Sequence, residues 1–342
     1  MYSLTIEDGV TPKTERYERS HLVKKEDSYK IVRPNDYAYN PMNLRFGSVA
    51  RHKGNSPVAV SGYYDIFTTV HKSDLPFMDS FLTCDPMITY YNRVSTGSLV
   101  EKQRVHFSQF LEFVLPLPAI NERAKIAAIL TTQDKVIELK EKRLAEKQRQ
   151  KKYLMQQLLT GKKRLPGFSK EWKSVRLRNT LNVCHGQNQR NVEQENGVYP
   201  ILGTGGEIGR TNDFLYDKPS ILIGRKGSIN KPMYMETPFW TIDTLFYCKI
   251  KSGYHPKFLF FKFQSINWNK YDESSGVPSL NASTIGSVDI FAPEFPEQTA
   301  IAEVLSAADR EIDLLRQDIE QEKQKKKALM QLLLTGIARV KT

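Results

Sequence analysis

The most constraining feature of this chain is an internal repeat. The segments Glu122–Leu165 and Glu297–Val340 align without a gap at an offset of 175 residues. Agreement is closest near their ends, where Leu158-Leu-Thr-Gly161 recurs as Leu333-Leu-Thr-Gly336. In both copies an arginine follows three residues later. Chance does not preserve spacing over roughly 40 residues, so the repeat indicates a duplicated structural unit.

Each copy of the repeat predicts one long helix. Positions spaced four and three residues apart form the inner seam that one helix of a coiled coil presents to another. Pro296 stands where helices commonly begin, Gly161 and Gly336 stand where they commonly end, and Pro166 opposes continuation of the first helix. The seam positions are 126, 130, 133, 137, 140, 144, 147, 151, 154 and 158 in the first copy, and 301, 305, 308, 312, 315, 319, 322, 326, 329 and 333 in the second.

A seam of this kind needs a partner helix. The other copy in the same chain is the nearest one, and a compact module between the copies would bring them together antiparallel. The alternative is a coiled coil that only dimerises the protein. The middle of the first copy is more polar than a strong coiled coil would have.

Two modules precede the two helices, and both predict a strand-rich fold. The expected organisation is a first recognition module at 1–118, a first helix at 119–165, a second module at 166–295 and a second helix at 296–342. The fold class is therefore α+β, with two strand-rich domains, two long antiparallel coiled-coil helices and an internal pseudo-twofold repeat. The predicted strand regions are Val58–Val70, Leu82–Tyr91, Phe110–Pro118, Ser220–Gly224, Phe239–Ile250 and Val288–Pro296, and a short helix is predicted at Pro256–Gln264.

The two modules do not begin alike. The second opens with Trp172, Leu177 and a polar approach to Tyr199. The first has no counterpart of that opening and leads directly into Gly9-Val10-Thr11-Pro12. We therefore expect the front edge of the first module to be shortened.

The chain is strongly basic, with a formal net charge of +12. A protein this basic usually binds a polyanion, either nucleic acid or an anionic membrane face. No apolar run is long enough to span a membrane, and the first residues carry no export signal, so nucleic acid and the cytoplasm are favoured. Three cysteines are too few and too scattered for a disulfide framework or a metal site, so neither is expected.

The chain resembles the specificity subunits of type I restriction–modification systems along nearly its whole length. The two segments ending in Leu-Leu-Thr-Gly carry the resemblance, supported by Pro296–Ile301, Tyr39–Arg45, Tyr199–Gly209 and Ile223–Ser228. It implies a chain without a catalytic centre or cofactor, whose two recognition domains each read half of a split double-stranded DNA target. It also implies that two modification subunits, which bring S-adenosylmethionine, dock on the helices and that restriction subunits can join them.

Two clusters are the candidate DNA-contacting residues. Arg225, Lys226 and Ser228 lie in a glycine-flanked loop where a backbone can approach DNA closely, arginine can pair with guanine and serine can bind phosphate. The corresponding set in the first module is Asn43, Arg45 and Ser48. A solvated turn and buried structural roles are the alternatives. Gly203–Gly209 lacks the spacing and context of a dinucleotide site, and we interpret it as a loop.

Three other functions fit the same sequence. One is the specificity subunit of a type IIB-like system, in which cleavage and modification share a chain. Another is an inactive or silent allele. The third is a coiled-coil scaffold that does not bind DNA.

Overall fold

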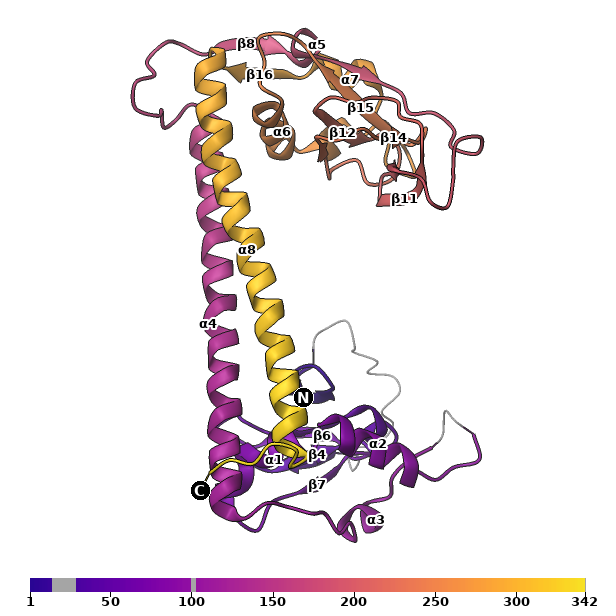
Figure 1. Ribbon diagram of the computed structural model, residues 1–342, viewed down its shortest axis with the longest axis vertical. Coiled ribbons are helices and arrows are strands. Elements are labelled where there is room, and N and C mark those ends of the chain that lie inside the picture. Colours follow the sequence, from indigo (N-terminus) through magenta and orange to yellow (C-terminus); the bar gives the residue numbers. More distant parts are fainter. Residues whose placement is uncertain (14–28, 100–102, 342) are drawn as a thin grey trace. The chain divides into compact units, whose positions relative to one another are not determined.

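The computed structural model describes residues 1–13, 29–99 and 103–341 (Figure 1). It forms two compact units, one made of Met1–Glu141 with Gln317–Thr342 and the other of Lys142–Arg316. Each unit contains one module and a stretch of each of two long helices, α4 (Ile120–Leu158) and α8 (Phe295–Leu334). The prediction of a strand-rich α+β fold with two long helices is confirmed.

The two helices pair along the predicted seam, and every predicted seam position is buried or half-buried. In the second unit Lys147 forms an ion pair with Glu311, while Lys151, further along α4, reaches back to Asp309. In the first unit Gln133 and Lys140 contact Glu322, and Lys140 also contacts Asp318. Residue numbers rise along one helix as they fall along the other, which confirms an antiparallel intrachain pair (Figure 1).

Both helices end in the same way. Gly161 and Gly336 adopt positive φ values of 71° and 75°, which a residue with a side chain rarely takes. Two residues beyond each glycine, the N–H of Lys163 donates to the Gln157 carbonyl and that of Ala338 donates to the Leu332 carbonyl. The glycines therefore terminate the helices as the sequence predicts.

The first module consists of short antiparallel strands and helices. Its core is shared with α4 and α8, because Ile126 and Leu130 near the start of α4 and Leu333 and Leu334 at the end of α8 pack on the module's aromatic residues. The sheets are β1–β2, β3–β6 and β5–β4–β7. The elements are β1 (Tyr2–Thr5), β2 (Gly9–Pro12), β3 (Tyr29–Val32), β4 (Tyr37–Tyr39), η4 (Leu44–Phe46), β5 (Val49–Arg51), β6 (Val58–Ser61), β7 (Asp65–Phe67), η5 (Lys72–Asp74), α1 (Leu75–Phe81), α2 (Asp85–Val94) and α3 (Phe107–Leu111).

The second module is built around a four-stranded antiparallel sheet, β13–β12–β15–β9. Its core also includes Leu158 at the end of α4, Leu159 directly after it, and Ile301 and Leu305 near the start of α8. Further sheets are β11–β10–β14 and β16–β8. The elements are β8 (Lys173–Arg176), α5 (Leu177–Thr180), β9 (Leu181–Cys184), β10 (Tyr199–Gly203), β11 (Gly206–Thr211), β12 (Ser220–Gly224), β13 (Met233–Met235), β14 (Trp240–Thr241), β15 (Leu245–Ile250), α6 (Pro256–Ser265), η7 (Trp268–Tyr271), α7 (Ala282–Ser287) and β16 (Asp289–Ala292).

Most local predictions for the second module are confirmed. The Ser220–Gly224 strand is β12, the Pro256–Gln264 helix is α6, and the lead-in to α8 contains β16. Phe239–Ile250 is two strands, β14 and β15, separated by a turn in which the Leu245 N–H donates to the Ile242 carbonyl. In the first module, Val58–Val70 likewise contains two strands, β6 and β7.

Two strand predictions in the first module are wrong. Leu82–Tyr91 lies mainly in helix α2, where Pro86 occupies the first turn and Met87 and Tyr91, four residues apart, face the core. That spacing is helical, and the aromatic content concealed it. Phe110–Pro118 ends helix α3 at Leu111 and then runs as irregular chain. Its equivalent in the second module is a strand only because β8 pairs with it.

Candidate nucleic-acid interface

The loop that follows β12 in the second module is held by its neighbours at Arg225. The Arg225 N–H donates to the Thr244 carbonyl at 2.8 Å, and its Nη1 donates to the Asp243 carbonyl at 3.2 Å. The Leu280 N–H in turn donates to the Arg225 carbonyl at 2.9 Å. The backbone of Arg225 is therefore held between two other loops, and one hydrogen bond orients the end of its side chain.

The structure brings this loop against the segment 272–281. The Gly227 N–H donates to the Pro278 carbonyl at 2.8 Å, and Lys226 forms an isolated bridge with Ser279. Asp272 organises the second loop by accepting hydrogen bonds from the Ser279 and Ser274 N–H groups. Those hydrogen bonds lower the pKa of the Asp272 carboxyl. Two segments about fifty residues apart thus form one surface.

Two glycines shape the Arg225 loop. Gly227 has a φ of +86°, the left-handed region that favours glycine. A methyl group on Gly224 would lie 2.5 Å from the Ser228 carbonyl oxygen, so the backbone passes itself too closely for any side chain. The glycine spacing noted in the sequence therefore has a structural cause within the loop itself.

The side chains of this loop are available to a ligand. Lys226 and Ser228 are exposed, and Arg225 is partly exposed. Among the described residues, neither Arg225 nor Lys226 has an ion-pair partner (Arg225 meets only a carbonyl). An uncompensated arginine and lysine beside exposed hydroxyl groups suit phosphates and the edges of bases. DNA contact by these residues stays a prediction.

The candidate residues of the first module surround the short helix η4. Asn43 is exposed and precedes the helix, and its carbonyl accepts hydrogen bonds from the N–H groups of Phe46 and Ser48. Ser48 is buried, and its carbonyl accepts from the Asn40 N–H. The structure therefore brings Asn43 and Ser48 together in one turn but leaves only Asn43 open to solvent.

Arg45 is partly buried and stacks on Phe46, with its guanidinium carbon 4.4 Å from the ring centroid. Its Nη1 donates to Gln103 Oε1 at 3.3 Å, and its carbonyl accepts from Asn92. Arg45 Nε is buried and has no acceptor among the described residues. Phe46 is 50% exposed, and it is a further candidate contact residue that the sequence analysis did not name.

Two reciprocal ion pairs also went unpredicted. In the second unit Arg164 forms two hydrogen bonds with Glu297, and in the first unit Arg339 does the same with Glu122. Each pair joins a residue of one copy of the repeat to a residue of the other. The two pairs are equivalent, since 164 matches 339 and 122 matches 297. Lys151 with Asp309 and Lys326 with Asp134 are related in the same way. The sequence signal that indicates these ion pairs is the presence of the same charged residues at matching positions of the two copies.

Other classes of site receive no support from the described residues. Those residues contain no group of histidine, cysteine and carboxylate side chains that could hold a metal ion. Cys84, Cys184 and Cys248 are all free thiols. No described helix is long and apolar enough to cross a membrane. Gly203–Gly209 spans the turn of the β10–β11 hairpin, in accord with its interpretation as a loop.

Comparisons with known proteins agree with this architecture. Residues 169–324 match the family model of the type I restriction modification DNA specificity domain. A Methanocaldococcus jannaschii protein assigned as the MjaX type I restriction enzyme specificity subunit is 28% identical, with 94% of this chain and 82% of that protein covered. The chain is similar in sequence and in fold to type I specificity subunits.

Two further proteins extend the likeness to type I specificity subunits. The MjaVIII specificity subunit of the same organism is 27% identical, over 68% of this chain and 64% of that protein. The crystal structure of the type I restriction–modification S subunit from M. genitalium superposes with a TM-score of 0.61 at 16% identity, covering 88% of this chain and 83% of that one. At that identity the superposition shows the shared fold alone.

Proposed function

We propose that this chain is the sequence-specific DNA-binding subunit of a type I restriction–modification complex and that it reads a bipartite target. The observation that carries the proposal is the reciprocal pairing of the two repeats. Arg164 with Glu297 and Arg339 with Glu122 build the same junction in each unit, while the loops around Arg225 and Asn43 differ. Two units with the same helix junction and different loops are suited to recognising two different half-sites.

The remaining assignments rest on this function. Two modification subunits dock on the paired helices and hold S-adenosylmethionine, and restriction subunits join that assembly. The chain supplies recognition and no catalysis, and the complex works in the cytoplasm. Phosphate contacts supply much of the affinity and make it sensitive to salt, and base contacts from the two loop clusters supply the sequence choice.

The test is to co-express the chain with a type I modification subunit and to map methylated bases across a genome. We expect a split motif with two specified parts and a fixed spacer. Exchange of residues 166–295 for the same segment of another specificity subunit should change one part of the motif and leave the other. A continuous motif, or a change in both parts, would contradict the proposal.

The alternatives are distinguished by further measurements on the co-expressed proteins. An inactive allele would co-purify with the modification subunits and direct no methylation. A scaffold without DNA-binding activity would show partner binding that is insensitive to salt and no retardation of DNA. A type IIB-like system would methylate a split motif through a partner that also carries the nuclease.

A further inference from the structure

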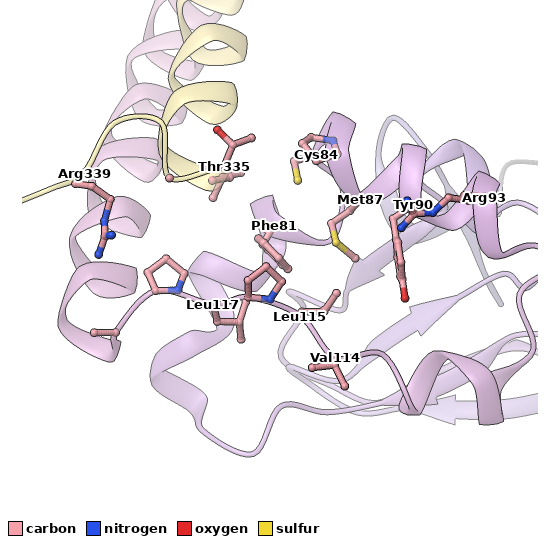
Figure 2. Close-up of a pocket in the computed structure, with 16 residues that line it drawn as sticks. Phe81, Cys84, Met87, Tyr90, Arg93, Val114, Leu115, Leu117, Thr335 and Arg339 are labelled. Atoms are coloured by element: carbon pink, nitrogen blue, oxygen red, sulfur yellow. The ribbon is translucent and has the colours of Figure 1, made fainter.

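The first unit contains an open groove at the end of α8. It has a volume of about 690 Å³. As Figure 2 shows, Thr335 and Arg339 come from the end of α8 and the chain after it, Phe81 and Met87 from the module, and Leu115 from the irregular segment before α4. Most lining residues are apolar, with Arg339 at one side and Arg93 at the other (Figure 2).

The matching place in the second unit is filled by Trp172. Its ring lies against Gly161, so that a methyl group on Gly161 would be 3.4 Å from the ring, and it packs edge-on to Phe258. Its Nε1 donates to Glu297 Oε2 at 3.3 Å, and the Arg164 guanidinium lies 5.8 Å from the ring centroid. Trp172 therefore covers the junction that the second unit shares with the first.

In the first unit, no aromatic ring of the described residues covers the matching junction in this way. A methyl group on Gly336, the equivalent of Gly161, would meet no described atom within 4 Å. Arg339 makes the same paired hydrogen bonds as Arg164, yet its side chain is 71% exposed where that of Arg164 is 26% exposed. Arg164 differs from Arg339 in lying beside the Trp172 ring and in donating a further hydrogen bond from Nη2 to the Lys170 carbonyl, and both partners belong to the segment that covers this junction.

Among residues 1–13, 29–99 and 103–341, none forms a strand paired with the irregular segment beside the groove. In the second unit β8 directly follows Trp172 and pairs antiparallel with β16. The repeat matches β16 to Val114–Leu117, where Val114 is 93% exposed and Leu117 is 39% exposed. An open groove and an unpaired edge thus lie where the second unit holds Trp172 and β8.

The prolines of this segment do not prevent pairing. Because the Leu177 N–H donates to the Val288 carbonyl, the ladder places the N–H groups of Ile290 and Ala292 toward β8 and that of Phe291 away from it. Pro116 matches Phe291, so its missing N–H removes no ladder bond. Leu115 and Leu117 match Ile290 and Ala292, so their N–H groups face the side on which β8 pairs in the second unit.

We propose that this groove and the Val114–Leu117 edge together bind a segment of another protein chain in which a tryptophan precedes a short β-strand. The indole fills the groove against Gly336 and Arg339, and the strand pairs with Val114–Leu117 as β8 pairs with β16. The occupant has the chemistry of residues 168–176 of this chain. The proposal does not depend on DNA recognition.

The test uses a labelled peptide with the sequence of residues 166–178 and the full-length protein. We expect saturable binding by fluorescence anisotropy, together with slowed amide hydrogen exchange in residues 113–118. Substitution of the peptide's Trp172 by alanine should weaken binding at least about tenfold, as loss of a buried aromatic anchor does. Absence of saturable binding, or equal binding of the alanine peptide, would overturn the proposal.

A matched pair of protein variants assigns the site. Leu117→Pro removes an N–H that faces the incoming strand, and Val114→Pro removes one that faces away, both at exposed positions. We expect Leu117→Pro to weaken peptide binding about tenfold or more, and Val114→Pro, whose side chain also lines the groove, to weaken it clearly less. Equal effects, or protection that maps to the second module, would also overturn the proposal.

Discussion

The guanidinium of Arg339 forms two parallel hydrogen bonds to the carboxylate of Glu122, from Nε to Oε1 and from Nη2 to Oε2, each 2.7 Å long. The two residues are far apart in sequence and join the chain after α8 to the first turn of α4. Arg164 and Glu297 form the same pair in the second unit. Each unit is thus closed by an arginine of one repeat and a glutamate of the other.

Substitution of Glu122 by glutamine should destabilise the first unit and change its response to acid. The hydrogen bonds from Arg339 lower the pKa of the Glu122 carboxyl below its ordinary value of 4.5. A lowered folded-state pKa gives stability that is present above the unfolded pKa and is lost as pH falls through the folded one. We expect thermal denaturation of wild type to show this loss and the variant to lack it. Glu112→Gln, at an exposed position, is the control and should behave as wild type.

Shortening a leucine of α8 to alanine should lower the free energy of unfolding substantially only where that leucine lies on the buried face of the helix. Leu305 is fully buried and Leu314 is 65% exposed on the same helix. We expect Leu305→Ala to lower the free energy of unfolding by about 2–5 kcal/mol and Leu314→Ala to change it by less than about 0.5 kcal/mol. Urea denaturation followed by circular dichroism measures both. Similar losses in the two variants would refute the observed helix pairing.

Lys262 should make the second unit more stable at alkaline pH. Burial lowers its pKa to about 8, and its Nζ donates to the Leu159 carbonyl. Between about pH 8 and the ordinary lysine value of 10.5, the folded state releases this proton while the unfolded state retains it. Stability should therefore rise with pH across that window, by up to about 3 kcal/mol.

The variant Lys262→Met isolates this effect. Methionine has a similar length and no titrating group, so its urea midpoint should lack the increment that wild type gains between pH 8 and 10.5. Parallel pH profiles for the two proteins would show that Lys262 is solvated rather than buried. The comparison is made on the full chain, because the acceptor Leu159 lies directly after α4.

Arg225 and Lys226 should affect DNA binding differently. If Arg225 reads a base, Arg225→Ala should cost about 1–3 kcal/mol on the cognate target and relax preference at one position of one half-site. If Lys226 contacts phosphate, Lys226→Ala should weaken all sequences alike and reduce the slope of log K against log salt by about one. Titrations with cognate and scrambled DNA at several salt concentrations distinguish them. A uniform loss from Arg225→Ala would reassign it to phosphate.

The long helices could be predicted because their signal is local and repeated. The four-three spacing through Leu130 and Leu305 defines a buried face whatever the surroundings, and Gly161 and Gly336 define the ends through backbone conformation. The antiparallel partner followed from chain connectivity. The polar middle of the seam is explained by Lys140, whose ammonium group meets Asp318 and Glu322.

The candidate DNA-contacting residues were only partly accessible to sequence reasoning. Residue type and flanking glycines indicated the Arg225 loop, but only the fold placed Pro278 and Thr244 against it. Burial of Ser48 and stacking of Arg45 on Phe46 depend on how η4 sits in its turn. Residue chemistry does not contain that information.

The sequence by itself determined the duplication, the two helices, their seam and their ends, because helical periodicity and terminal glycines act over a few residues. The tertiary structure alone decided which partners close each unit. Arg339 meets Glu122 because antiparallel pairing returns the end of one repeat to the start of the other. It also decided that 289–292 is a strand and Val114–Leu117 is not, since a strand exists only where a second one satisfies its hydrogen bonds.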